Sequence, residues 1–255
     1  MSEPQVLTMM FDVICIGSAT VDMFLDTDLH EHFLDKKVEI CYPLGAKLKI
    51  NKLDIFTGGG GTNTAVAFSR LGLKTGYVGK IGRDMNGSMI YDELKREHVK
   101  FMGVISKDKT DFSIVLDSKG KDRTILNYKD ASSKLKYSEI KTGFSTRWFY
   151  FSSMIGESLK TIKETAVRAR GKINLGFNAS SYLVKNGIGP IKEILKASTV
   201  FVLNKEEAEM LVGKSKIEQM LVKIRNAGPR IVCITDGEKG SHLYDGRMYY
   251  YQKAR

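Results

Sequence analysis

The chain has 255 residues, of which 42% are hydrophobic and 27% charged, and its formal net charge is +11. This length suits one large α/β domain with a small appendage, and the composition is that of an ordinary globular protein. No apolar run approaches the roughly 18 residues of a membrane span, and the N-terminus has no basic leader. We therefore expect a cytoplasmic protein without a membrane anchor or a signal peptide.

The positive charge is spread along the chain and contains no block of five or six basic residues. A solvated basic surface explains this pattern better than a nucleic-acid interface does, although a nucleic-acid-binding role stays open as a third hypothesis. Cys15 and Cys233, two of the three cysteines, lie in strand-like runs, which indicates a reducing compartment and core packing.

The first predicted element is a buried strand from Phe11 to Gly17, with Ser18–Asp22 as its exit. Ligands of open α/β sheets bind at the carboxyl ends of strands, so Asp22 lies where a substrate could be contacted. A turn-capping aspartate would show the same pattern.

Two stretches predict short antiparallel strands of a small separate sheet. Residues from about 36 to 57 alternate imperfectly around a Pro43–Gly45 break, and Asp111–Tyr128 alternates around a turn at Ser118–Lys121. Strand–turn–strand elements of this kind differ from the βα alternation that surrounds them.

Four consecutive glycines, Gly58 to Gly61, follow a strand-like run and lead into a helical pattern. Thr62, Asn63 and Thr64 can cap this helix, Ala65, Val66, Phe68 and Leu71 can form its apolar side, and Gly72 can end it. Glycines let backbone N–H groups approach a ligand at a helix N-terminus, but a plain tight turn would use the same residues. The spacing matches neither a P-loop, because Asn63 and Thr64 replace the required Lys and Ser/Thr, nor a dinucleotide fingerprint.

The rest of the chain predicts regular βα units. Strands are expected at Thr75–Ile81, Val99–Ser106, from Arg147 through WFYFSS, and at Ile173–Phe177, Thr199–Leu203 and Ile231–Ile234; helices at Asn86–His98, Ser158–Arg170, Ile188–Lys196, Lys205–Leu211 and Ser215–Asn226; and a final hairpin at Ser241–Tyr251. Asp84 is expected to initiate the first of these helices. Repeated units of this length predict a mostly parallel sheet covered on both faces.

Two linked motifs carry a family resemblance. Gly58-Gly59-Gly60-Gly61-Thr62-Asn63, followed by Gly82-Arg83-Asp84-Met85-Asn86-Gly87, resembles the first signature of the ribokinase-like (PfkB) family of carbohydrate and nucleoside kinases. The resemblance implies a ribokinase-like three-layer α/β/α fold with a mostly parallel central sheet and a small β-sheet lid. The kinase domain would span residues 1–255, with its lid formed by residues of about 36–57 and 111–128.

The resemblance also implies an acceptor site. In the family, the position of Asp22 binds sugar hydroxyls, and Gly59, Gly60 and Asn63 would complete the binding of a sugar or nucleoside. The family uses its lid to exclude water from the site and often to form dimers, so a homodimer through the lid is a further implication.

A second set of residues resembles the family's nucleotide site. Asn204-Lys205-Glu206-Glu207 matches an Asn-x-x-Glu motif, which implies that Asn204 and Glu207 organise Mg²⁺ and its waters, with Glu207 as the metal-site residue. Helix capping by Asn204 is compatible with that role. Thr235–Gly240 resembles the Thr-x-Gly-x-x-Gly turn, so Thr235, Gly237 and Gly240 would approach ATP, although a plain glycine turn is the alternative. Asn178, at the end of a strand, would face the phosphates.

One family motif is absent from this sequence. Family members carry Asp-Thr-x-Gly-Ala-Gly-Asp near the C-terminus, and its final aspartate is the general base. We therefore assign no catalytic residue and expect it beyond Arg255. The main hypothesis is an ATP- and Mg²⁺-dependent kinase that phosphorylates a hydroxymethyl group of a sugar or nucleoside. The alternative is a catalytically inactive relative that binds a sugar or nucleoside as a sensor or partner.

Overall fold

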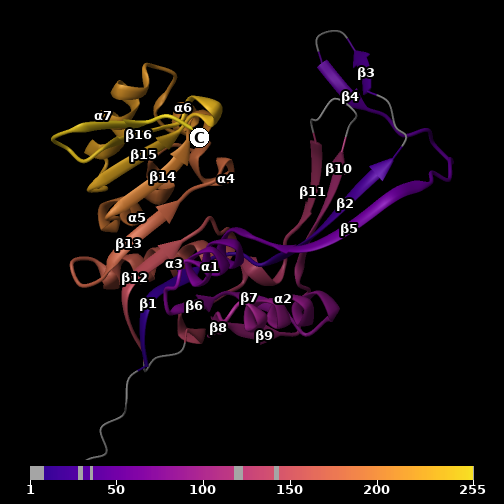
Figure 1. The fold of residues 1–255 in the computed structure, drawn as a ribbon, viewed down its shortest axis with the longest axis horizontal. Coiled ribbons are helices and arrows are strands. Elements are labelled where there is room, and N and C mark those ends of the chain that lie inside the picture. The colour runs from indigo at the N-terminus through magenta and orange to yellow at the C-terminus, as the bar shows by residue number, and fades with distance from the viewer. Residues whose placement is uncertain (1–8, 28–30, 35–36, 118–122, 141–143, 255) are drawn as a thin grey trace, which may run out of the picture.

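The computed structural model describes residues 9–27, 31–34, 37–117, 123–140 and 144–254. A large twisted sheet with its helices forms the body of the molecule, and a smaller sheet projects from one side of it (Figure 1). None of the helices within these ranges is long and apolar enough to cross a membrane.

The large sheet has nine strands in the order β17-β16-β15-β14-β13-β12-β1-β6-β8. They are β1 (Met9–Ile16), β6 (Thr75–Val78), β8 (Lys100–Phe101), β12 (Phe144–Phe151), β13 (Asn174–Asn178), β14 (Val200–Asn204), β15 (Ile231–Thr235), β16 (Ser241–Tyr244) and β17 (Tyr249–Gln252). Neighbours run parallel from β8 to β15, whereas β16 and β17 form the predicted antiparallel hairpin. Two short strands, β7 (Lys80–Gly82) and β9 (Val104–Ser106), pair with each other.

The helices are α1 (Gly60–Arg70), α2 (Met85–Arg96), α3 (Gly156–Ala169), α4 (Ser181–Val184), α5 (Lys192–Ala197), α6 (Lys205–Val212) and α7 (Ile217–Asn226). Their sequence spacing decides which side is buried. In α3 the buried positions follow one stripe at helical spacing: Ser158, Thr161, Ile162, Thr165, Ala166 and Ala169. The sequence did not predict α4, whose four residues are too short for a periodic pattern.

The alternation of side chains along β12 separates two cores. Phe149 and Phe151 pack into the larger core, whereas Trp148 and Tyr150 pack against the smaller one on the opposite face. This arrangement confirms the predicted three-layer α/β/α fold. Beside α1, the second face carries an apolar groove of about 440 Å³, to which Val200 also contributes.

The small sheet has the order β11-β10-β2-β5 and forms the lid. Its strands are β2 (Thr20–Thr27), β5 (Ile50–Gly58), β10 (Asp111–Asp117) and β11 (Arg123–Tyr128), and a hairpin of β3 (Glu31–Leu34) and β4 (Lys37–Ile40) continues from it. β5, β10 and β11 fall in the two predicted lid segments; residues 35–36 and 118–122, including the predicted turn, lie outside the described residues.

The interpretation of Ser18–Asp22 as a strand exit is wrong. Only three residues separate β1 from β2, so the chain leaves the large sheet and enters the lid at once. β2 pairs in parallel with β10 and antiparallel with β5, so the lid is mixed rather than wholly antiparallel as expected.

Two details of α1 also differ from the expectation. The helix begins at Gly60 with Gly59 as its N-cap residue, so Thr62 and Thr64 lie inside it. Their hydroxyls donate to the carbonyls of Gly58 and Gly60, one turn back, instead of capping backbone N–H groups. Leu71 stands at the C-terminal cap, is largely exposed and adds nothing to the apolar side.

Candidate active site

A cavity of about 490 Å³ lies between the lid and the carboxyl ends of the large sheet. Its floor comes from the residues that follow β1, β12 and β13, and from the start of α1; its other wall comes from β2, β10 and β11. Such a place, at strand ends and beneath a second layer, is where open α/β sheets bind ligands.

The glycines allow α1 to start against the end of β1. A Cβ atom on Gly61 would lie 2.7 Å from the Gly17 backbone, and one on Gly60 would lie 2.8 Å from the Cβ of Ser152. Gly59 has a φ of +105°, a conformation that favours glycine, and a Cβ there would lie 2.5 Å from the Ser18 carbonyl oxygen. The N-terminus of α1 therefore reaches the cavity, where its partial positive charge favours hydroxyl and anionic groups.

Asp22 lies on the lid wall in a row of polar residues. It is the register partner of Ser113 on β10, which in turn is the partner of Asn127 on β11. The Ser113 hydroxyl donates to Asn127 Oδ1 at 2.9 Å, and Asn127 Nδ2 donates to the Tyr182 hydroxyl of α4 at 3.3 Å. This chain of hydrogen bonds ties the lid to the body beside the Asp22 carboxylate.

Of the predicted acceptor residues, Asp22, Gly59 and Gly60 line the cavity. Asn63 does not: it is exposed on α1, and its backbone N–H donates to the Gly59 carbonyl as part of the first helical turn. Asn178, predicted to face the phosphates, also lines the cavity, and its Nδ2 donates to the Val202 carbonyl at 3.0 Å.

Asn204 and Thr235 are register partners at the carboxyl ends of β14 and β15, further along the same sheet edge. Asn204 and Glu207 form a reciprocal capping box at the start of α6: Glu207 N–H donates to Asn204 Oδ1 at 2.8 Å, and Asn204 N–H donates to Glu207 Oε2 at 2.9 Å. Burial raises the pKa of Glu207 above its ordinary value. The hydrogen bond from the Asn204 N–H lowers it, but by less than burial raises it.

The donor set around Glu207 fits a hydrated Mg²⁺ rather than a cation enclosed by protein. Within the described ranges, no three His, Cys, Asp or Glu side chains gather so that they could hold a metal ion. Mg²⁺ takes oxygen ligands and usually keeps several waters, so one carboxylate and one amide oxygen next to phosphate oxygens are adequate.

The predicted nucleotide turn begins with Thr235 and contains a short 3₁₀ helix, Gly237–Lys239. Asp236 N–H donates to the Gly240 carbonyl at 2.8 Å, and Lys205 of α6 pairs with the Asp236 carboxylate at 3.1 Å. Gly240 has a φ of +95°, and a Cβ there would collide with the Gln252 carbonyl of β17. Gly240 therefore has a packing role whether or not a nucleotide approaches it.

The second glycine motif does not line the cavity but anchors the lid. Asp84 caps α2, as expected: its Oδ1 accepts from Gly87 N–H at 2.8 Å, and its Oδ2 accepts from Thr110 N–H at 2.8 Å. Thr110 directly precedes the lid strand β10. Burial tends to raise the pKa of Asp84, but the hydrogen bonds from Thr110 and Gly87 together hold it below its ordinary value.

The sequence reasoning missed several residues of the cavity, among them Ser113, Asn127, Lys129, Ser152 and Tyr182. Ser152 is 3% exposed, and among the described residues its hydroxyl finds no hydrogen-bond partner. The alternation of Arg123, Ile125 and Asn127 along β11 is visible in the sequence, but it identifies a cavity wall only once the register with β10 is known.

The comparison with protein families decides the classification. The model of the pfkB family carbohydrate kinases matches residues 10–254. The chain belongs to this family. Its members are phosphotransferases that act on carbohydrates, and the resemblance drawn from the two glycine motifs is thereby confirmed.

Several curated proteins are similar to this chain at low sequence identity. An uncharacterized sugar kinase of Archaeoglobus fulgidus is 26% identical over 71% of this chain and 74% of its own length. A probable fructokinase-5 of Arabidopsis thaliana is 25% identical over 73% of this chain and 63% of its own length. A 5-dehydro-2-deoxygluconokinase of Clostridium perfringens is 26% identical over 94% of this chain and 73% of its own length. The chain thus spans between about three fifths and three quarters of these relatives.

Solved structures support the fold. A ribokinase from Thermotoga maritima superposes with a TM-score of 0.76 at 19% identity, covering 96% of this chain and 78% of the ribokinase. A nucleoside kinase from Methanocaldococcus jannaschii gives a TM-score of 0.74 at 18% identity, covering 95% of this chain and 76% of that kinase. Both confirm the ribokinase-like fold class.

Proposed function

We propose that this chain transfers a phosphoryl group from ATP, with Mg²⁺, to a hydroxymethyl group of a sugar or nucleoside. The observation that carries the proposal is the lidded cavity, which gathers Asp22, the glycine start of α1 and Asn178 at one end of the sheet. Family membership and the sugar kinase and fructokinase relatives support a carbohydrate acceptor.

In this proposal Asp22 accepts hydrogen bonds from acceptor hydroxyls, and Gly59 and Gly60 let the N-terminus of α1 pack against Ser18 and Ser152 and so reach the acceptor. Asn63 would join them only if its exposed side chain turned toward the cavity. The lid excludes water, which otherwise competes with the acceptor hydroxyl for the phosphoryl group. These residues contribute by positioning, which supplies a large share of the rate in phosphoryl transfer.

The nucleotide would lie along the carboxyl ends of β13 to β15, against Asn178, Asn204 and the Thr235–Gly240 turn. When bound, ATP supplies the phosphoryl group and Mg²⁺ neutralises charge on its oxygens. Glu207 and Asn204 would hold the waters of the cation. The general base is assigned to no residue of this chain, because the family's Gly-Ala-Gly-Asp motif does not occur in the sequence.

The test separates binding from turnover. Calorimetry without nucleotide measures acceptor binding against a panel of sugars and nucleosides, and an assay of ADP release measures acceptor-dependent turnover. We expect Asp22→Ala to weaken acceptor binding far more than ATP binding; equal losses in both would contradict the assignment of Asp22. Acceptor binding with no turnover would favour the alternative, an inactive relative that acts as a sensor or partner.

A further inference from the structure

The charged side chains that line the acceptor cavity are not balanced. Arg123 and Lys129 face it from the lid strand β11 and the residue just after it, whereas Asp22 is the one carboxylate among those lining side chains that the structure describes. A site for a neutral sugar needs hydroxyl partners but gains little from two cationic side chains, whereas an anionic group on the sugar would pair with them.

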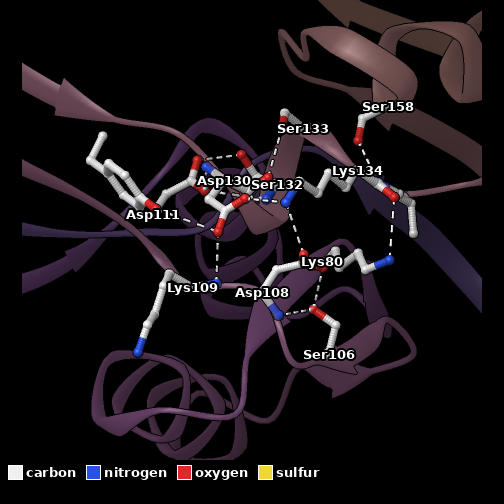
Figure 2. Close-up of polar contacts among 12 residues, drawn as sticks. Lys80, Ser106, Asp108, Lys109, Asp111, Asp130, Ser132, Ser133, Lys134 and Ser158 are labelled. Atoms are coloured by element: carbon white, nitrogen blue, oxygen red, sulfur yellow. Dashed lines mark hydrogen bonds and ion pairs between the residues drawn. The ribbon is translucent and has the colours of Figure 1, made fainter.

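Lys129 is oriented by a buried carboxylate. Its Nζ lies 3.4 Å from Oδ2 of Asp111, which is fully buried at the start of β10. Asp111 also accepts from the backbone N–H groups of Asp130 at 2.9 Å and Ser132 at 3.2 Å, and from the Ser132 hydroxyl. Figure 2 shows Asp111 next to Ser132, whereas the Asp130 carboxylate points toward the backbone N–H of Lys109 and the ammonium of Lys134.

This arrangement leaves Lys129 able to bind a second anion. The Asp111 carboxylate accepts hydrogen bonds from three other donors, which hold it in place. Its contact with Lys129 therefore orients the ammonium group but uses only part of its hydrogen-bonding capacity. An ammonium has three N–H donors, and the donors not directed at Asp111 remain for a ligand in the cavity.

Arg123 adds a second cation on the same side of the lid. Among the side chains that the structure describes, no carboxylate forms an ion pair with its guanidinium; the side chain of its register partner, Asp117, lies outside that set. A guanidinium presents paired N–H donors that match a carboxylate or a phosphate.

Both cations lie on the acceptor side of the cavity. They occupy the same strand face as Asn127, which is bonded to Ser113, the register partner of Asp22. The predicted nucleotide residues Asn204 and Thr235 lie on the large sheet instead.

We propose that the acceptor is an anionic sugar. Asp22 binds its hydroxyls, Lys129 and Arg123 bind its carboxylate or phosphate, and Asp111 acts as a positioning residue through Lys129. This inference rests on the proposed function of the same cavity and narrows its substrate class.

The experiment is calorimetry at low salt, without nucleotide, on matched ligands: fructose as the neutral sugar, gluconate as the sugar acid and fructose 6-phosphate as the sugar phosphate. The expected result is binding of at least one anionic ligand about tenfold or more tighter than fructose, with the preference shrinking as salt is added. Tighter binding of gluconate assigns the anion as a carboxylate, and tighter binding of fructose 6-phosphate assigns it as a phosphate; either supports the inference.

Two charge-removing variants test the residues. Lys129→Gln and Arg123→Gln should each reduce the affinity for the preferred anion about tenfold while leaving fructose binding unchanged, and Lys214→Gln, an exposed lysine on the loop before α7, should change neither. Asp111→Asn should weaken anion binding in the native background and have no further effect in Lys129→Gln. If Asp111→Asn does not fold, the Lys129→Gln and Arg123→Gln variants still test the inference.

The outcomes distinguish a failure of the anionic-acceptor inference from a failure of the proposed kinase function. Fructose binding at least as tight as that of both gluconate and fructose 6-phosphate overturns the inference and leaves the kinase proposal standing. Glutamine variants that weaken the binding of ATP rather than that of the anionic sugar have the same consequence. A protein that binds none of the sugars or nucleosides of the panel overturns both.

Discussion

At the residue scale, one buried side chain of the cavity, Ser152, departs from the rule that buried polar groups are hydrogen-bonded. The Ser152 hydroxyl is buried without a partner among the described residues, which costs about 1–3 kcal/mol in the absence of a ligand. Ser158, equally buried in α3, has its Oγ accept from Leu135 N–H at 2.8 Å and shows the ordinary arrangement. Because Ser152 also lines the cavity, we propose that its hydroxyl forms a hydrogen bond with the acceptor.

We therefore expect Ser152→Ala to keep or raise the free energy of unfolding while weakening acceptor binding about threefold to tenfold. Ser158→Ala should do the opposite: it leaves Leu135 N–H unpaired and lowers the unfolding free energy by about 1–3 kcal/mol, with little effect on binding. Urea unfolding and calorimetry measure the two quantities. Loss of stability in both variants would show that Ser152 is structural.

Glu207 gives a prediction about pH. Because burial raises its pKa, the carboxylate keeps its proton to a higher pH than an ordinary glutamate, and in the proposed Mg²⁺ site only the ionised form would hold the cation. We expect the Mg²⁺ dependence of ATP binding to strengthen as pH rises through this raised pKa and to weaken below it. In Glu207→Gln the dependence on pH in that range should vanish. A Mg²⁺ titration at a series of pH values measures this, and an unchanged profile in the variant would remove Glu207 from the metal site.

At the element scale, Asp84 joins the start of α2 to the root of the lid strand β10 through Gly87 and Thr110. Asp84→Ala removes three hydrogen bonds, one of which is the N-cap bond from Gly87, so we expect a loss of about 1–2 kcal/mol or more in unfolding free energy at neutral pH. The pKa of Asp84 is lowered in the folded state, so its contribution is present above its ordinary value of 3.8 and is lost as pH falls through the folded pKa. The difference between native protein and variant should therefore narrow in acid, as urea unfolding at several pH values would reveal.

The same scale shows how far the sequence predicts this structure. Strands β12 to β15 and helices α2, α3, α6 and α7 follow from periodicity and capping, because each buries a face that its own sequence defines. β2 does not: Thr20–Thr27 has the alternation of a strand, but its partners β5 and β10 lie far away in sequence, and only their pairing makes it a lid strand.

Some residues of the candidate site could likewise be predicted from the sequence, and others could not. Asp22, Gly59 and Gly60 are predicted through the family motifs, and Asn178 through those motifs and its place at the end of a strand; all four line the cavity. Asn127 and Lys129 were missed because the alternation of the predicted β10–β11 hairpin does not say which of its faces meets the large sheet. Tyr182 was missed because the four residues of α4 are too few for a periodic pattern. Asn63 was placed in the site by its motif, yet the helix that begins at Gly60 turns it outward.

At the scale of the whole molecule, the lid has two different faces. Its inner face bears Asp22, Ser113 and Asn127, whereas most register partners on the outer face are apolar. They include Met23, Leu25, Leu53, Ile55, Ile114, Leu116 and Leu126. Leu53, Ile55 and Leu126 are each more than two fifths exposed. An apolar sheet face of this extent commonly marks an interface, and we propose that two lids pack against each other in a homodimer.

The dimer is tested by placing charge on the outer face of the lid. We expect the double variant Ile55→Lys with Leu126→Lys to shift the protein from dimer to monomer in light scattering coupled to gel filtration, because two lysines cannot be buried against a copy of themselves. Val222→Lys on α7 replaces an equally exposed apolar residue far from the lid and should leave the mass unchanged. If the lid closes the cavity only when its partner supports it, the double variant should also bind the acceptor more weakly, whereas Val222→Lys should not. A native protein that is monomeric at every concentration, with full acceptor affinity, would exclude the dimer.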